Sequence, residues 1–427
     1  MREMKDSGVE WIGEIPKEWH ITQTRRLFRN EKNIVGDAAD EYERLALTLK
    51  GVIKRSKNDS EGLQPEKFEG YQILRQNELV FKMIDLENVN TSRVGLSPYT
   101  GLVSPAYIVL KNDSDDNRYE YYWFMSMYYN EVFNHLGGDG VRSALNVKDM
   151  LSLPIPNIPK IQKKMLADYL DAKCSKIDEI IEKQQAIIEK LKEYKLSIIT
   201  EGVTKGLKHN VKMKDSGVRF VDTIPYDWEN RKMITILSTR VVDGPHESPE
   251  LYDTGIPYIS ATAIVNGKID FSLMRGYISK EYCEICDKRY SPQRGDLLVV
   301  KLGASTGQVA IVDTDERFNI WVPLAAVRCN DEALPKFVYY VFQSDYFVRQ
   351  MELSWTFGTQ QTLGVQTIEK LRILLPPIAE QREIVKFLDT IYDNVGSKIE
   401  NVEKMIEKLE EYKKSLIYEV VTGKKEV

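Results

Sequence analysis

Residues 4–9 read Met-Lys-Asp-Ser-Gly-Val, and residues 213–218 repeat these six letters without a change. An Ile-Pro-x-x-Trp motif occurs at residues 15–19 and again at residues 224–228, so the offset between the two copies is 209. Solenoid repeats have periods of only about 20–50 residues. A duplication on this scale therefore predicts two complete domains.

Further along the chain the offset between the copies becomes 218. Residues 190–195 (KLKEYK) correspond to residues 408–413 (KLEEYK) at this offset. Because the two offsets differ by nine, the second copy holds nine additional residues, which lie between Trp228 and Asp296. The order along the chain is predicted to be domain, helix, domain, helix.

The helices are predicted from apolar residues that recur at alternating spacings of three and four. This heptad pattern is typical of a long helix that buries one stripe against a partner helix. We expect helices at residues 160–203 and 377–427, each after a pair of prolines, that pack antiparallel. An ordinary helical hairpin without functional geometry is the alternative. The predicted seams are Ile177, Ile180, Gln184, Ile187, Leu191, Tyr194 and Ile198, and Val395, Lys398, Val402, Met405, Leu409, Tyr412 and Leu416, with Leu191 and Tyr194 against Leu409 and Tyr412.

The other two segments, residues 1–159 and 204–376, alternate short β-rich runs with Gly, Asn and Asp turns. Trp19 and Trp228 are expected in their cores. The predicted fold class is α+β (mixed α/β), with two pseudo-repeated globular domains separated by two long helices packed as an antiparallel coiled coil. The expected strands are 78–82, 106–110, 296–301 and 308–312, and the expected shorter helices are 119–129 and 337–351.

The composition is that of a soluble globular protein, with 42% hydrophobic and 29% charged residues in 427. No apolar run is long enough to span a membrane, and the charged first twenty residues do not resemble a signal peptide. Four cysteines fit a reducing cytosol. The net charge of −5 argues against a nonspecific DNA-coating protein but allows a DNA reader with segregated charge.

Catalytic motifs are weak or missing. Residues 303–307 (GASTG) match the serine-hydrolase pattern G-x-S-x-G, but the following residues look like a strand, and no histidine comes after His246. Cys283 and Cys286 could form half a zinc site, yet no second Cys pair completes it. Phosphate-binding and dinucleotide-binding glycine motifs are absent. We expect no catalytic residue and no metal in this chain, with a serine hydrolase as the rival interpretation.

Several loops carry residue types that read DNA. Arg142 and Ser143 align at offset 218 with Gln360 and Gln361, and arginine pairs with guanine whereas glutamine pairs with adenine. The loop 243–249 is polar and rich in turn residues. Lys82, Arg93, Lys268 and Lys301 are predicted to contact phosphates. The full set of predicted DNA-binding residues is Lys82, Arg93, Arg142, Ser143, His246, Lys268, Lys301, Ser305, Thr306, Gln360 and Gln361.

These segments resemble the DNA-specificity subunits of type I restriction–modification systems along essentially the whole chain. The resemblance rests on residues 8–19 (GVEWIGEIPKEW), 83–86 (MIDL), 104–107 (SPAY), 243–246 (DGPH) and, most specifically, 375–381 (LPPIAEQ). The first copy departs from the last motif, because residues 156–162 (PNIPKIQ) lack its glutamate.

The resemblance implies that residues 1–159 and 204–376 are target recognition domains that each read half of a bipartite double-stranded DNA sequence. The helices would set the gap between the half-sites. Methyltransferase subunits, usually two, would dock on this scaffold with S-adenosylmethionine, and a restriction subunit would supply ATP hydrolysis and cleavage. No cofactor is expected in this chain. A coiled-coil scaffold without DNA contact is a second rival interpretation.

Overall fold

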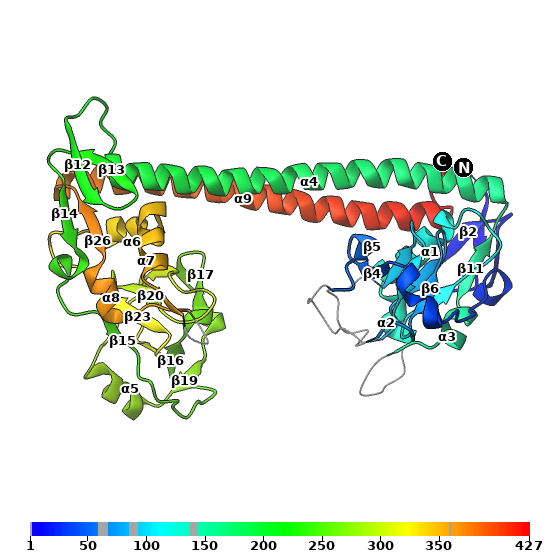
Figure 1. Cartoon of the computed structure of the whole chain (residues 1–427), viewed down its shortest axis with the longest axis horizontal. Helices are drawn as coiled ribbons and strands as arrows, with labels where there is room; N and C mark the ends of the chain where they lie inside the picture. Colours follow the sequence, from blue (N-terminus) through cyan, green and yellow to red (C-terminus); the bar gives the residue numbers. More distant parts are fainter. Residues whose placement is uncertain (1, 59–66, 85–92, 137–143, 358–360) are drawn as a thin grey trace. The chain divides into compact units, whose positions relative to one another are not determined.

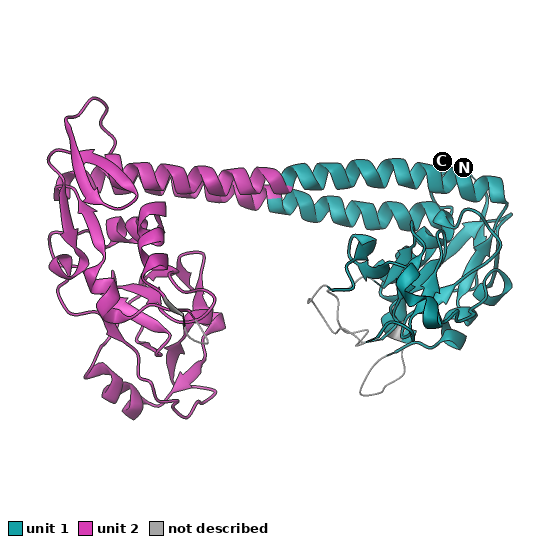
Figure 2. Cartoon of the chain, viewed as in Figure 1, with its two compact units in different colours: residues 1–184, 403–427 teal, residues 185–402 magenta. Residues whose placement is uncertain are grey.

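The computed structural model describes residues 2–58, 67–84, 93–136, 144–357 and 361–427. The chain divides into two compact units (Figure 2). Unit 1 comprises residues 1–184 and 403–427, and unit 2 comprises residues 185–402. Each unit contains one globular region and part of both long helices. Within the described ranges, no helix is long and apolar enough to cross a membrane.

The two long helices are α4 (Lys160–Lys205) and α9 (Ile378–Val421) (Figure 1). In unit 1 the early α4 residues Cys174 and Ile177 share a core with the late α9 residues Leu416 and Ile417. In unit 2 the core contains late α4 residues, Ile199 and Val203, with early α9 residues, Ile384 and Leu388. Residue numbers therefore rise along one helix as they fall along the other, and the predicted antiparallel packing is confirmed.

The helices use a different face from the predicted one. Tyr194 and Tyr412 are 49% and 53% exposed, so their assignment to the seam is wrong. At alternate positions of each predicted seam, the residue that turns inward is the next one along the chain. Ile188, for example, is buried, whereas the predicted Ile187 is exposed. Leu409 and Ile181 both pack against the core of unit 1. The predicted contact of Leu409 with Leu191 stays a prediction. The residues that turn inward are Cys174, Ile177, Ile181, Gln184, Ile188 and Leu191 in α4, and Val395, Ile399, Val402, Ile406, Leu409 and Leu416 in α9.

The described part of the first globular region contains a four-stranded sheet, a three-stranded sheet, the two-stranded pairs β1–β2 and β3–β11, and three short α-helices around one main core. The four-stranded sheet has the order β5-β4-β9-β6, and the three-stranded sheet has the order β10-β7-β8. The bounds are β1 Met4–Asp6, β2 Glu14–Pro16, β3 His20–Gln23, β4 Arg44–Thr48, β5 Gly51–Arg55, β6 Gln72–Leu74, β7 Leu79–Phe81, β8 Val94–Leu96, β9 Gly101–Val103, β10 Ile108–Leu110, α1 Arg118–Tyr129, α2 Val132–Leu136, α3 Val147–Ser152 and β11 Pro154–Asn157.

The second globular region is built on the same plan with additional short strands. Its four-stranded sheet has the order β15-β23-β20-β21, and its three-stranded sheet has the order β19-β16-β22. The bounds are β12 Met213–Val218, β13 Val221–Pro225, β14 Glu229–Lys232, β15 Val242–Asp243, β16 Ile256–Ile259, β17 Ile264–Val265, β18 Lys268–Ile269, β19 Gly276–Ile278, α5 Lys280–Asp287, β20 Leu297–Val300, β21 Val309–Ile311, β22 Asn319–Ile320, β23 Leu324–Val327, α6 Pro335–Gln343, α7 Asp345–Leu353, β24 Thr356–Phe357, β25 Gln361–Thr362, α8 Val365–Lys370 and β26 Arg372–Leu375.

The repeat motifs occupy matching places in the two regions. Trp19 and Trp228 are both buried in their cores, as expected. The hairpin β1–β2 of the first copy corresponds to β12–β13 of the second. The predicted fold class, with its globular pair and two long helices, is confirmed. The assignment of residues 1–159 and 204–376 as target recognition domains stays a prediction.

The predicted helix 337–351 is interrupted. Ser344 has an extended conformation with φ −72° and ψ 146°, so α6 ends before it and α7 begins after it. The Ser344 hydroxyl donates to the carbonyl of Val341 at 2.6 Å. The next backbone N–H, of Asp345, donates to Thr200 Oγ1 of α4 at 2.9 Å. The break thus turns the first donor of α7 toward the long helix.

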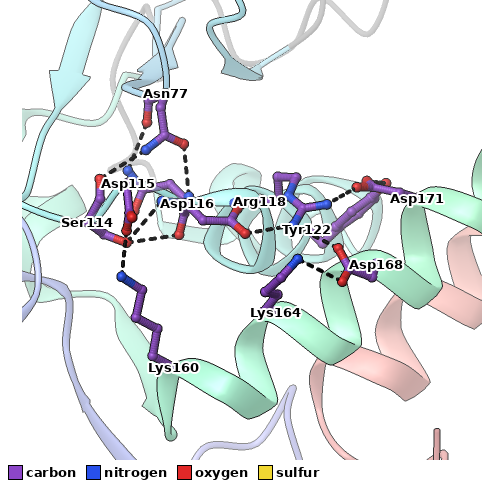
Figure 3. Close-up of polar contacts among 11 residues, drawn as sticks. Asn77, Ser114, Asp115, Asp116, Arg118, Tyr122, Lys160, Lys164, Asp168 and Asp171 are labelled. Carbon is purple, nitrogen blue, oxygen red and sulfur yellow. Dashed lines mark hydrogen bonds and ion pairs between the residues drawn. The ribbon is translucent and has the colours of Figure 1, made fainter.

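A polar clasp joins the first globular region to α4 (Figure 3). Arg118 of α1 donates to Asp171 Oδ2 at 2.6 Å and also pairs with Asp116 and Asp168. The buried hydroxyl of Tyr122 donates to Asp171 Oδ1 at 2.7 Å. The second copy repeats the clasp at offset 218: the hydroxyl of Tyr340 donates to Asp389, and Lys336 lies 3.5 Å from the same carboxylate. The same chemistry therefore anchors each region to its helix.

The glutamine of the LPPIAEQ motif is structural. Gln381 is fully buried at the start of α9, where its side chain donates to the carbonyls of Glu332 and Pro376 and accepts from the N–H of Leu334. At the matching position of the first copy, Lys163 forms an ion pair with Glu120 at 2.7 Å. Both side chains tie the start of a long helix to its globular region, by different chemistry.

Candidate nucleic-acid interface

The GASTG motif forms the tight loop between β20 and β21. Gly303 and Gly307 have φ angles of 100° and 94°, which glycine adopts readily and other residues rarely do. The N–H of Thr306 donates to Gly303 O at 3.1 Å and closes the loop. The predicted strand–loop–strand arrangement is confirmed. Ser305 is half-buried on a hairpin instead of a strand-to-helix elbow, so nothing here supports the hydrolase alternative.

The hairpin β24–β25 lies against this loop. The carbonyl of Gln361 accepts from the N–H of Gly303 at 3.2 Å and from the Thr306 hydroxyl at 3.3 Å. The N–H of Leu363 donates to Lys301 O at 2.8 Å. Four predicted DNA-binding residues, distant in sequence, are therefore neighbours: Lys301, Ser305, Thr306 and Gln361. The Thr306 side chain is buried and its hydroxyl also bonds Gly303 O at 2.6 Å, which leaves Ser305 as the accessible hydroxyl.

Asp243, at the end of β15, contacts basic side chains from three segments. Its carboxylate lies 2.8 Å from Lys301 Nζ and 3.3 Å from His246 Nε2, and it accepts a hydrogen bond from Arg289. Burial alone would raise the pKa of Asp243, but the hydrogen bond and charge of Lys301, aided by Arg289, hold that pKa below its usual value. The sequence prediction missed Arg289, because it lies 46 residues from Asp243 and belongs to no motif.

The cluster changes the predicted role of Lys301. Its side chain is only 11% exposed and is committed to Asp243, so the predicted phosphate contact is not supported by this geometry. His246 is the exposed member, with 69% of its side chain accessible. His246 lies on the DGPH loop. Residue 244 of this loop is a glycine because a Cβ there would lie 2.3 Å from Ile320 O and 2.6 Å from Trp321 Cα.

The remaining predicted residues are dispersed. Arg93 is 2% exposed and donates to Ile84 O at 2.9 Å, so its predicted phosphate contact is wrong: the guanidinium is used inside the first region. Lys82 is half-buried, and its backbone N–H donates to Arg93 O at 3.0 Å. Lys268 is exposed on the hairpin β17–β18. Arg142, Ser143 and Gln360 lie outside the described residues, and their DNA contacts stay predictions.

The cysteine pair belongs to a hydrophobic core. Cys283 and Cys286 lie on α5, both buried, and Cys283 packs with Tyr258 and Ile278. Burial raises the pKa of both thiols. Among the residues whose placement is described, no group of three His, Cys, Asp or Glu side chains is arranged to hold a metal ion.

Comparisons with known proteins place this arrangement in context. The family described as "Type I restriction modification DNA specificity domain" matches residues 225–411. The chain is 26% identical over 271 residues to the type I restriction enzyme EcoBI specificity subunit of Escherichia coli, covering 61% of this chain and 56% of that protein. It is 23% identical over 436 residues to a putative type I restriction enzyme MjaX specificity subunit of Methanocaldococcus jannaschii, covering 97% and 95%.

The fold also matches a solved structure. A chain from a structure of the type I R-M system, described for its complex assembly and conformational transition, has a TM-score of 0.67 at 14% identity. The match covers 95% of this chain and 98% of the other. At this identity the likeness concerns the fold alone.

Proposed function

We propose that the chain belongs to the type I restriction–modification DNA specificity family and is the non-catalytic subunit that selects the DNA sequence on which such a complex acts. Each globular region reads one half of a bipartite target, and the two helices set the distance between the half-sites. The observation that carries the proposal is the duplicated fold, in which each globular region is joined to a long helix by the same tyrosine–aspartate hydrogen bond, Tyr122–Asp171 in the first copy and Tyr340–Asp389 in the second.

The charge of the chain supports a shared DNA interface. The net charge is −5, and the cations Arg289 and Lys301 are already paired with Asp243. A chain of this kind gains little affinity from counterion release. We therefore assign much of the phosphate contact to methyltransferase subunits, two in the simplest symmetric arrangement, which would also bring S-adenosylmethionine. A restriction subunit would bring ATP hydrolysis and cleavage, in the cytoplasm, and this chain would bind no cofactor.

The test is a comparison of methylated DNA sequences in the host with the gene intact, deleted, and restored. We expect one bipartite methylated motif to disappear on deletion and to return on restoration. A methylation pattern that does not change on deletion would contradict the proposal. A coiled-coil scaffold without DNA contact predicts a different result, since altering the loops at Ser305 and Gln361 would then leave the methylated motif unchanged.

Partner dependence is tested by DNA binding in solution. The chain alone should bind target and non-target duplexes with similar, weak affinity, and the methyltransferase subunits should raise the affinity for the target and steepen its salt dependence. Equal target preference with and without those subunits would argue against a shared interface.

A further inference from the structure

Arg275 differs from the seven other arginines that lie between residues 231 and 349. Its guanidinium lies over the indole of Trp321, with the central carbon 3.3 Å from the ring centroid, and no carboxylate of the described residues forms an ion pair with it. Every other arginine between residues 231 and 349 is neutralised by a carboxylate. The pairs are Arg231–Glu332, Arg240–Glu369, Arg289–Asp243, Arg294–Asp315, Arg317–Asp287, Arg328–Asp296 and Arg349–Asp345.

The guanidinium is partly desolvated as well as unpaired. Within the described part of the chain, Nη1 of Arg275 is buried without a hydrogen-bond acceptor. The neighbouring indole Nε1 of Trp321 is likewise a buried donor with no acceptor among these residues. Burying a charged donor without an acceptor is unfavourable, and the attraction to the indole face compensates only in part. Stability of the free chain therefore does not explain why an arginine stands here.

The stacked pair adjoins the candidate interface. Gly244 of the DGPH loop lies tightly against the backbone of Trp321. Two residues after Trp321, the carbonyl of Pro323 accepts from the N–H of Lys301 at 2.8 Å. The backbone of Arg275 is fixed by its own N–H, which donates to Tyr258 O at 3.0 Å. Arg275 and Trp321 therefore lie beside the cluster of His246 and Lys301 around Asp243.

We propose that Arg275 is a specificity-determining residue that donates two hydrogen bonds to one guanine in the half-site read by the second globular region. The inference rests on the proposed function. Stacking on Trp321 fixes the plane of the guanidinium, which a two-bond contact to O6 and N7 of guanine requires. With Nη1 directed into the protein, the edge formed by Nε and Nη2 is the one that meets the base. Arg289 and Lys301, already paired, support the surface without reading it.

The test is a methylation assay with the complete methyltransferase complex, on duplexes that vary each base pair of the target in turn. Arg275→Ala should lower the preference for one G·C pair by about 5- to 150-fold, the range for loss of a bidentate contact, and leave the other half-site unchanged. Arg275→Lys should cause nearly the same loss, because lysine keeps the charge but not the planar pair of donors. Trp321→Phe should cause a smaller loss at the same base pair.

Controls separate the possible outcomes. Arg294→Ala removes an exposed arginine of the same region that already pairs with Asp315, and it should leave base preference unchanged. Unchanged discrimination at the first half-site shows that the complex is assembled, and unchanged discrimination at the other base pairs of the second half-site shows that the second region is folded. If Arg275→Lys retains wild-type preference, or if Arg275→Ala weakens all duplexes equally, the residue contacts phosphate and the inference is overturned. If the wild-type complex methylates no specific sequence, the proposed function fails instead.

Discussion

Removing the Asp171 carboxylate should loosen the first globular region from α4. Tyr122 is a buried residue whose hydroxyl donates to Asp171 at 2.7 Å, and Arg118 donates to the other carboxylate oxygen at 2.6 Å (Figure 3). Asp171→Ala removes the acceptor of the Tyr122 hydroxyl, whereas Arg118 keeps its ion pairs with Asp116 and Asp168. The unsatisfied hydroxyl dominates the cost, which is about 2 kcal/mol for a buried hydrogen-bonding group.

This cost converts into a measurable shift. For a folding unit of about 200 residues, each kcal/mol lowers the unfolding midpoint by about 2–4 °C, so we expect a decrease of about 4–8 °C. Differential scanning calorimetry of the full chain measures the midpoint. Hydrogen exchange of the peptides covering α1 shows whether the loss is in unit 1, because their protection should fall while that of α6 stays unchanged.

A matched variant and a double-mutant cycle test the reasoning. Asp168→Ala removes an exposed carboxylate that also pairs with Arg118, and it should shift the midpoint much less because no buried donor loses its partner. Tyr122→Phe combined with Asp171→Ala should cost clearly less than the two single changes added together. Equal shifts for Asp168→Ala and Asp171→Ala, or additive single changes, would refute the assignment of the clasp to Tyr122.

Three further predictions follow from the same structure. Asp243→Asn should destabilise the second region by about 3 kcal/mol, because the buried ammonium of Lys301 loses its counter-charge. Thermal unfolding measures this loss, and Asp315→Asn, which breaks an exposed ion pair, is the control. The pKa of Asp243 is lower in the folded chain than in the unfolded chain. The stabilising contribution of its carboxylate is therefore fully present above the unfolded pKa of about 3.9 and is lost as pH falls through the folded value. Wild type and Asp243→Asn should therefore become equally stable in acid. Arg142→Ala and Gln360→Ala should each relax one half-site only, by about 1–3 kcal/mol of discrimination in a methylation panel, and equal effects on both half-sites would contradict modular reading. Ending the chain before Pro377 should expose the apolar stripe of α4 and cause association, visible as a concentration-dependent mass in light scattering.

The architecture could be predicted from the sequence because its signals are local. The repeated MKDSGV and Ile-Pro-x-x-Trp motifs revealed the duplication, and the three-and-four spacing of apolar residues revealed the long helices. The strands β20 and β21, with the glycine loop between them, were likewise readable from neighbouring residues. Each of these features is encoded within a few turns or one hairpin.

The face of each long helix could not be predicted in the same way. Ile180-Ile181 and Ile187-Ile188 are doubled isoleucines, so two heptad frames that differ by one residue are equally apolar. The partner helix buries Ile188 and leaves Tyr194 exposed. The choice between the frames depends on how the helices pack against each other and their globular regions, which no single helix encodes.

The candidate site was decided almost entirely by tertiary structure. The sequence contains the DGPH loop, but it does not show that Asp243 meets Arg289 and Lys301, or that Arg275 lies on Trp321. It offered Arg93 and Lys301 as phosphate contacts, and folding committed both to internal partners. The physical reason is that the residue type gives a side chain its charge, whereas folding decides whether that side chain is exposed and free to contact DNA or is buried beside a carboxylate or carbonyl.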